Sequence, residues 1–351
     1  MTMRPCLLLF ALLLCPLPSA ATEALANRAL AEAGLSMTYS LDSIECAQPE
    51  AASQSPFFEQ FGTGRRRTRD VRVSAIALDA DGHLISVALD GDCTRYRVRR
   101  RDGTTFEAEL VAWDETSSVG VLRSDEATVA PSLGDPAELR PGDPVWVFGT
   151  AYDMPGTIGH GVISSTRRYL PNQYESHYIQ TDAPTHRGQS GGPVLDGSGR
   201  VVALNAYVLV RGGRSSFDGL AFALPIDVAL RIADDLLEHG AYLPARIGVD
   251  LGGRTREADV DAAEDAPDDA SLAMEEEAED DGTTVTRADP DGPSRGLLEV
   301  GDRIVAIDGR AIASGQDLIV SVRLHRPGDA IPLRIERAGE IIDVVIFAGA
   351  P

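Results

Sequence analysis

The chain has 351 residues, 43% of them hydrophobic, and its 32 basic residues (all arginine) and 54 acidic residues give a net charge of −22 at pH 7. This length is typical of two domains and allows a substantial buried core. The apolar content excludes a wholly disordered chain. The excess of acid argues against nucleic-acid binding, because such binding depends on neutralising phosphates with basic side chains.

The start of the chain has the pattern of a secretory signal peptide. A short basic leader ends at Arg4, an apolar run extends from Cys6 to Cys15, and small residues allow cleavage after Ala20 or Ala21. We therefore predict a signal peptide over residues 1–21 and an exported protein; an uncleaved anchor is the alternative. No other apolar stretch approaches the length of a membrane span, so we expect no transmembrane segment in the mature chain.

Two cysteines, Cys46 and Cys93, remain after removal of the leader. An even pair in an oxidising compartment indicates a disulfide, although the residues alone leave open whether the two are joined. No C-x-x-C motif occurs and the six histidines are scattered, so we predict no metal ion and no other cofactor.

Residues 22–70 precede the main β-rich region. Thr22 to Gly34 has helical periodicity and is expected to form a short helix or arm. The loop that follows contains an aromatic cluster, Phe57, Phe58 and Phe61, and an arginine-rich run from Arg65 to Arg69.

From residue 71 to residue 241, short β-type runs alternate with glycine and aspartate turns. Many short strands without intervening helices are typical of a barrel or sandwich. One helix closes the region, because Ile226–His239 has apolar residues at helical spacing and stops at Gly240. The predicted strands are Val71–Leu78, His83–Leu89, Arg95–Val98, Phe106–Ala112, Val119–Arg123, Pro144–Phe148, Gly161–Ser165, His177–Gln180, Val194–Leu195, Val201–Val210 and Leu220–Leu224.

Residues 242–351 are predicted to form a second unit. Its acidic stretch, Glu257 to Asp281, holds thirteen acids in twenty-five residues and no base, a composition typical of a disordered, solubilising loop. The unit ends in a β-rich region from Thr283 to Phe347, within which Ser314–His325 predicts one amphipathic helix that begins at Ser314.

The motif with the clearest chemistry is Gly188-Gln-Ser190-Gly-Gly-Pro193. Small residues on both sides of a serine let the backbone turn sharply and expose the hydroxyl. They also allow the N–H groups of Gly188 and Ser190 to converge as an oxyanion hole.

With its flanking residues, Gln180-Thr-Asp182 before it and Gly197 to Asn205 after it, this motif resembles the HtrA (Deg) family of exported trypsin-like serine proteases with C-terminal PDZ domains. The resemblance covers roughly residues 55–351 and includes the hairpin Ser74–Ser86. It implies a mainly β fold, in which a trypsin-like domain of two six-stranded barrels precedes a PDZ domain. The active site of such a domain lies in the cleft between the barrels.

Two members of the family's catalytic triad are missing. The match from Gly82 puts Leu89 at the position of the histidine, and Ser118 stands where the family has its aspartate. Leucine cannot accept the proton that a serine hydroxyl must lose as it attacks. We therefore predict a pseudoprotease that retains only the nucleophile position, Ser190. The alternative is a serine endopeptidase of envelope protein quality control that uses Ser190 with a non-standard base, such as His186.

The resemblance also assigns a peptide groove to the second unit. Arg246-Ile247-Gly248-Val249 matches the PDZ turn whose N–H groups receive a peptide's terminal carboxylate, and Gln316–Leu324 matches the helix that walls the groove. Such grooves bind peptides by strand addition. A PDZ remnant that only packs against the barrels is the alternative. A regulatory role for residues 257–281, either shielding the groove or contacting the arginine-rich segments 65–72 and 95–101, is the alternative to a solubilising loop.

These inferences predict a periplasmic protein that binds peptides or unfolded envelope proteins through its PDZ domain and its degenerate cleft. The resemblance implies a homotrimer built through the aromatic N-terminal region, or assembly with active HtrA relatives. A purely structural envelope protein is a third alternative.

Overall fold

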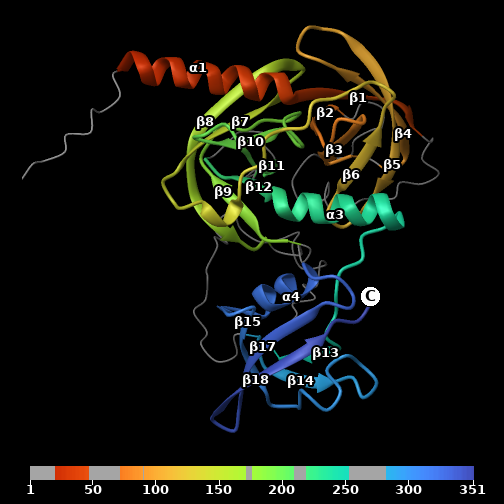
Figure 1. Ribbon diagram of the computed structural model, residues 1–351, viewed down its shortest axis with the longest axis vertical. Coiled ribbons are helices and arrows are strands. Elements are labelled where there is room, and N and C mark those ends of the chain that lie inside the picture. Colours follow the sequence, from red (N-terminus) through yellow and green to blue (C-terminus); the bar gives the residue numbers. More distant parts are fainter. Residues whose placement is uncertain (1–19, 47–71, 90, 171–175, 209–218, 253–281) are drawn as a thin grey trace, which may run out of the picture.

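The computed structural model describes residues 20–46, 72–89, 91–170, 176–208, 219–252 and 282–351 (Figure 1). Residues 1–19 of the expected signal peptide, the aromatic and arginine-rich loop and the acidic stretch 257–281 lie outside these ranges. The predicted mainly β fold is confirmed: two closed six-stranded barrels precede a smaller unit of two sheets and one helix. Within the described part of the chain, no helix is long and apolar enough to cross a membrane.

The first barrel has the strand order β1-β2-β3-β6-β5-β4. A disulfide joins Cys46 of β1 to Cys93 of β4, which lie opposite each other with their Cα atoms 3.8 Å apart. The barrel interior is filled by alternate residues such as Leu41, Leu84 and Leu122, all fully buried. The strands are β1 (Thr38–Cys46), β2 (Arg72–Ala77), β3 (His83–Val87), β4 (Cys93–Arg99), β5 (Thr105–Trp113) and β6 (Val119–Arg123).

The second barrel has the order β10-β11-β12-β9-β8-β7. Its core includes Val145, Ile163 and Val194. The strands are β7 (Pro144–Ala151), β8 (Met154–Arg168), β9 (Tyr178–Thr181), β10 (Pro193–Asp196), β11 (Val201–Val208) and β12 (Ala221–Pro225), and a 3-10 turn, η1 (Pro136–Glu138), precedes β7.

Strand β1 was not among the predicted strands, although it pairs with both β2 and β4. The first barrel therefore begins at Thr38, ahead of the expected boundary at residue 71. Tyr39 and Leu41 point into the core and alternate with Ser40 and Asp42, so the period-2 signal of a strand was present. It was obscured because the strand follows a helix directly and is separated from β2 by residues 47–71.

In the described ranges, two helices flank the barrels. Helix α1 (Ala20–Met37) runs past the predicted end at Gly34 and packs on β7, where a Cβ at Gly34 would lie 2.2 Å from the Phe148 ring. Helix α3 (Ile226–His239) has the predicted bounds and ends at Gly240, whose left-handed backbone (φ 73°) lets its N–H bond to Leu236 O. The apolar face of α3 covers residues of both barrels (Figure 1).

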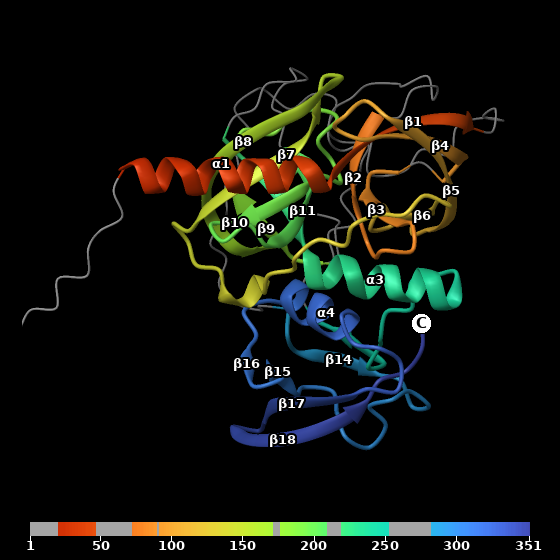
Figure 2. The same cartoon turned by 45° about the horizontal axis from the view of Figure 1, so that its top comes forward.

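The C-terminal unit follows α3. Its helix α4 (Gly315–Arg323) is capped by Ser314, as predicted, and faces the barrels, whereas the four-stranded sheet lies on the far side (Figure 2). Ile304, Leu318 and Ile335 form the centre of its core. The strands are β13 (Val249–Leu251) and β14 (Val285–Ala288) in one sheet, and β15 (Arg303–Ile307), β16 (Arg310–Ala311), β17 (Ala330–Arg337) and β18 (Glu340–Phe347) in the other.

Candidate functional site

Ser190 lies where the two barrels meet. Its carbonyl oxygen accepts a hydrogen bond from Ser74 N (2.8 Å) on β2 of the first barrel. Its side chain is half-buried, and Oγ donates to the main-chain oxygen of Ala206 on β11 (3.3 Å). The hydroxyl therefore rests on a carbonyl, which cannot remove its proton.

The turn that leads into Ser190 presents two main-chain N–H groups, those of Gly188 and Ser190. Gly188 has φ 97°, and a Cβ there would lie 2.1 Å from Thr150 O, so only glycine fits. The carbonyl of Gly188 is fixed by Ser74 Oγ (2.8 Å). No residue in the described ranges accepts a hydrogen bond from the N–H of Gly188 or of Ser190. Two unpartnered donors of this kind suit a negatively charged or strongly polarised oxygen.

The segments that carry the other two expected triad positions lie beside this loop. Ala88 N donates to Ser118 O (2.9 Å), and a Cβ at Gly191 would lie 3.0 Å from Val87 N. Leu89 is 1% exposed and belongs to the core of the first barrel, where its Cδ1 lies against Gly120. Ser118 is also buried, with a left-handed backbone (φ 56°), and its Oγ donates to Glu115 O.

His186, which the sequence suggests as a substitute base, and the further histidines His83 and His160 have neighbours other than Ser190 Oγ. The His186 ring lies 5.5 Å, centroid to centroid, from the Tyr152 ring, and the main-chain N–H of His186 donates to Gln189 Oε1 (2.8 Å). His83 contacts Asp79 and Arg123, and His160 stacks on Trp146. Among the described residues, none offers an imidazole to Ser190 Oγ. In these same ranges no cluster of histidine, cysteine, aspartate or glutamate is arranged to hold a metal ion.

A groove of about 370 Å³ runs between β13 and α4 in the C-terminal unit. Arg246, Ile247, Gly248 and Val249 all line it, as do Leu318 and Val322 of α4. No described residue accepts a hydrogen bond from the N–H of Ile247 or Gly248. The left-handed turn at Gly248 (φ 73°) packs against Pro293. The groove therefore combines an apolar wall with free N–H donors at one end, which is the arrangement that captures a terminal carboxylate.

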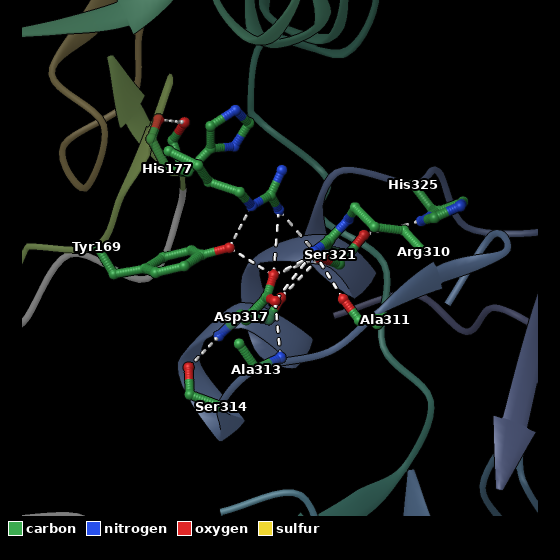
Figure 3. Close-up of polar contacts among 11 residues, drawn as sticks. Tyr169, His177, Arg310, Ala311, Ala313, Ser314, Asp317, Ser321 and His325 are labelled. Carbon is green, nitrogen blue, oxygen red and sulfur yellow. Dashed lines mark hydrogen bonds and ion pairs between the residues drawn. The ribbon is translucent and has the colours of Figure 1, made fainter. Parts of the chain in front are cut away.

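The face of α4 that points away from the groove is bound to the second barrel (Figure 3). Asp317, with 3% of its side chain exposed, accepts two hydrogen bonds from Arg310 (2.7 and 2.9 Å). The barrel contributes Tyr169, whose hydroxyl donates to Asp317 Oδ1 (2.5 Å), and Arg167, whose Nη2 lies 3.3 Å from the same oxygen. The helix that walls the groove is thus anchored to the barrel through one buried carboxylate.

The electrostatics of this contact are set by burial and by the two arginines. Burial would raise the pKa of Asp317, but hydrogen bonds from Arg310 and Tyr169 outweigh it and hold that pKa well below its usual range. Burial and the hydrogen bond to Asp317 raise the pKa of Tyr169 to about 12. Burial, followed by the positive charges of Arg167 and Arg310, lowers the pKa of His177 to about 3. His177 is therefore neutral at ordinary pH.

Sequence reasoning identified the groove and the serine loop but missed two positioning contacts. Ser74, fully buried, holds the carbonyl of Gly188 through its hydroxyl, whereas the sequence indicated only that Ser74 belongs to a hairpin. The sequence indicated only that Asp317 belongs to a helix, because its partners Arg167 and Tyr169 are about 150 positions away in the chain. The one available signal was the position of Asp317, an acidic residue in the first turn of the predicted helix, three residues after the N-cap Ser314.

The fold is that of a trypsin-like domain joined to a PDZ domain. The first has two closed six-stranded barrels with a glycine-flanked serine between them, and the second has a groove between β13 and α4 with free N–H groups at one end. Family models agree: that of the trypsin-like peptidase domain matches residues 58–204, and that of the PDZ domain matches residues 247–346. The chain belongs to the HtrA/Deg family.

Individual relatives are consistent with this assignment. A probable periplasmic DegP-like serine endoprotease of Halomonas elongata is 30% identical over 280 residues, covering 79% of this chain and 56% of the relative. The corresponding protein of Pseudomonas fulva is 32% identical over 310 residues, covering 83% and 61%. The chain thus spans a little over half the length of these relatives.

Solved structures share the fold. The HtrA-type protease AlgW with a tripeptide superposes with a TM-score of 0.66 at 25% identity, covering 92% of this chain and 97% of that one. A serine endoprotease from Yersinia pestis superposes with a TM-score of 0.57 at 19% identity, covering 95% and 99%.

Proposed function

We propose that this protein is an exported, HtrA-like peptide-binding protein that does not cleave what it binds. The observation that carries the proposal is Leu89, a leucine buried in the core of the first barrel at the position that the family resemblance gives to the general base.

The chemistry of the cleft supports inactivity. A serine hydroxyl attacks a peptide only as a base removes its proton, and Leu89 has no atom that can do so. Loss of a triad member typically slows turnover by on the order of 10⁴- to 10⁶-fold. The unpartnered N–H groups of Gly188 and Ser190 can still hold a peptide carbonyl, so the cleft is able to bind a segment that it does not hydrolyse.

The groove supports peptide binding. Its free N–H groups at Ile247 and Gly248 suit a terminal carboxylate, and the apolar side chains of Val249, Leu318 and Val322 suit the last side chain of a peptide. The homologous protease AlgW is known with peptides of three and of ten residues. We propose that C-terminal segments of unfolded envelope proteins are the ligands here.

A pair of variants tests the binding half of this proposal. Ile319 lines the groove, and Ile341 is 59% exposed on β18, outside it. In fluorescence anisotropy with labelled heptapeptides that end in Val, Leu or Phe, Ile319→Glu should weaken binding at least about tenfold, because it places a carboxylate beside that of the ligand. Ile341→Glu should bind as the unaltered protein does. Equal affinities for all three proteins would refute peptide binding in the groove.

The alternative function is a serine endopeptidase that uses Ser190 with a non-standard base. The preserved donor pair at Gly188 and Ser190 favours it. The two proposals differ in one outcome, the appearance of fragments when an unfolded protein such as reduced casein is incubated with the mature chain. Fragments that the Ser190→Ala variant does not produce would establish the endopeptidase.

Location and assembly are further proposals. The pattern of residues 1–21 and the periplasmic names of the relatives support export to the periplasm. The family resemblance supports a homotrimer formed through Phe57, Phe58 and Phe61, or assembly with active HtrA relatives.

A further inference from the structure

Strand β13 has a free edge toward the groove, and the direction of its backbone groups fixes how a peptide strand can pair with it. Gly248 O accepts from Asp289 N (2.9 Å), Gly252 N donates to Thr284 O (2.6 Å), and Asp250 O accepts from Thr286 Oγ1 (3.1 Å). The even-numbered residues of this segment thus turn their main-chain groups toward β14. Since these groups alternate along a strand, those of Val249 and Leu251 face the groove.

A peptide whose terminal carboxylate sits on the N–H groups of Ile247 and Gly248 must run antiparallel to β13. Its last residue then lies opposite Val249, its penultimate residue opposite Asp250, and the residue before that opposite Leu251. The main-chain hydrogen bonds of this pairing come from Val249 and Leu251. The penultimate residue and Asp250 therefore form a non-hydrogen-bonded pair, the kind in which opposite side chains approach most closely.

Asp250 carries a negative charge at this point on the outer face of the sheet. Its carboxylate is 59% exposed and accepts a hydrogen bond from Arg287 Nε (2.7 Å), the residue directly opposite on β14. A bound peptide would lie on the other side of Asp250. Opposite charges on facing residues stabilise a strand pair, and like charges destabilise it.

We infer that Asp250 makes the groove selective for peptides with lysine or arginine as the penultimate residue. The bound state is then a three-strand ladder of alternating charge: Arg287, Asp250 and the basic side chain of the ligand. The other cations at the groove, Arg246 and Arg323, lie at the carboxylate turn and the last turn of α4, so they favour the terminal carboxylate. This inference rests on peptide binding by the groove, as proposed above.

The test uses the mature full-length chain and labelled heptapeptides with Lys, Ala or Glu as the penultimate residue, each made with Val, Leu and Phe as the last. We expect the Lys peptide to bind about three- to tenfold more tightly than the Glu peptide, with Ala between them, because the ratio combines the attraction of an exposed ion pair with the repulsion between like charges. The ratio should fall in 0.5 M NaCl, because salt screens exposed charges.

Substitutions at Asp250 test whether this residue causes the preference for a basic penultimate residue. Asp250→Asn should remove most of the Lys-over-Glu ratio, and Asp250→Lys should reverse it. The matched control is Asp343→Asn, which removes an aspartate from an equivalent exposed pair with Arg334 (2.7 Å) on β17 and β18, outside the groove; it should leave the ratio unchanged.

The outcomes separate this inference from the function on which it rests. Peptides that bind with equal affinity whatever the penultimate residue would overturn the inference and leave peptide binding intact. A preference for Glu that disappears in Arg287→Gln would overturn it in favour of Arg287 as the selecting charge. Failure of every peptide to bind would contradict both.

Discussion

The hydroxyl of Ser190 contacts the main chain of β11. It donates to the carbonyl of Ala206, whereas a working nucleophile donates to a base. Leu89, at the position that the family resemblance gives to the general base, packs in the core of the first barrel, where its Cδ1 lies against Gly120. On the proposed function, a core side chain thus takes the place of the base, while the hydroxyl of Ser74 still holds the carbonyl of Gly188.

This arrangement predicts the effect of restoring the two triad residues. In the double variant Leu89→His, Ser118→Asp, the adjacency of positions 88 and 118 should let the new carboxylate orient the new imidazole. We expect hydrolysis of unfolded casein to rise at least about 10²-fold above the unaltered chain, since a triad contributes several orders of magnitude. The control is the triple variant with Ser190→Ala, which should be inactive. A double variant that folds normally yet remains inactive would show that the cleft has lost more than its base.

The two faces of helix α4 contact different parts of the molecule. Leu318, Ile319 and Val322 line the groove, whereas Asp317 and Ser321 face the second barrel and the side chain of Arg310 (Figure 3). Asp317 also accepts from Ala313 N (3.1 Å), so it fixes the start of the helix as well as its contact with the barrel. The geometry of the groove therefore depends on a carboxylate on the opposite side of its wall.

Removing that charge should destabilise the fold more than removing an exposed one. Asp317→Asn leaves Arg310 and Arg167 without their carboxylate, and breaking a buried pair in this way costs about 3–5 kcal/mol. The two guanidinium groups are 40% and 29% exposed, so we expect a smaller loss of about 2 kcal/mol in the free energy of unfolding.

Guanidinium-induced unfolding of the full chain measures this loss. Asp343→Asn, on the exposed pair with Arg334, is the matched control and should change the free energy by less than about 0.5 kcal/mol. Equal effects of the two substitutions would mean that the Asp317 contact is not a source of stability.

The elements that the sequence predicted well are those with a local signal. Helix α3 has regular apolar spacing and a glycine stop, and its predicted and observed bounds agree. Strand β8, predicted as Gly161–Ser165, extends over Met154–Arg168, because its ends are held by pairing with β7 and β9 rather than by their own side chains. Long-range pairing of this kind leaves little trace in local composition.

At the scale of the whole molecule, the two domains meet at a buried polar contact. His177 lies there with Nδ1 unpartnered among the described residues, next to Arg167, Arg310 and Asp317. Its folded pKa of about 3 lies below the ordinary value of 6.5. The unfolded chain therefore takes up a proton as the pH falls below 6.5, and the folded chain does not until about pH 3.

Stability should thus be lost as the pH falls from about 6.5 toward 3. Between pH 7 and pH 5 the loss attributable to His177 is about 2 kcal/mol, and carboxyl groups contribute little there because they titrate mainly below pH 5. Chemical denaturation at the two pH values measures it, with His177→Gln as the variant that should lose much less. The same pH dependence in both proteins would place its origin elsewhere.

The distribution of charge also belongs to this scale. Thirteen of the 22 net negative charges lie in residues 257–281, between β13 and β14, so the rest of the chain is only mildly acidic. The amino-acid composition identified this acidic stretch, but it could not indicate which residues lie near it in space. The sequence likewise revealed each part of the groove, whereas the attachment of α4 to the barrel became visible only when residues far apart in the chain were brought together.

Whether Ser190 is an activated nucleophile is the question on which the account depends. The mature chain is incubated with a serine-directed fluorophosphonate and its intact mass is measured. We predict no added phosphonyl mass, because no base removes the proton of Ser190 Oγ. Stoichiometric addition of one phosphonyl group, absent from the Ser190→Ala variant, would contradict the central claim that the cleft binds without cleaving.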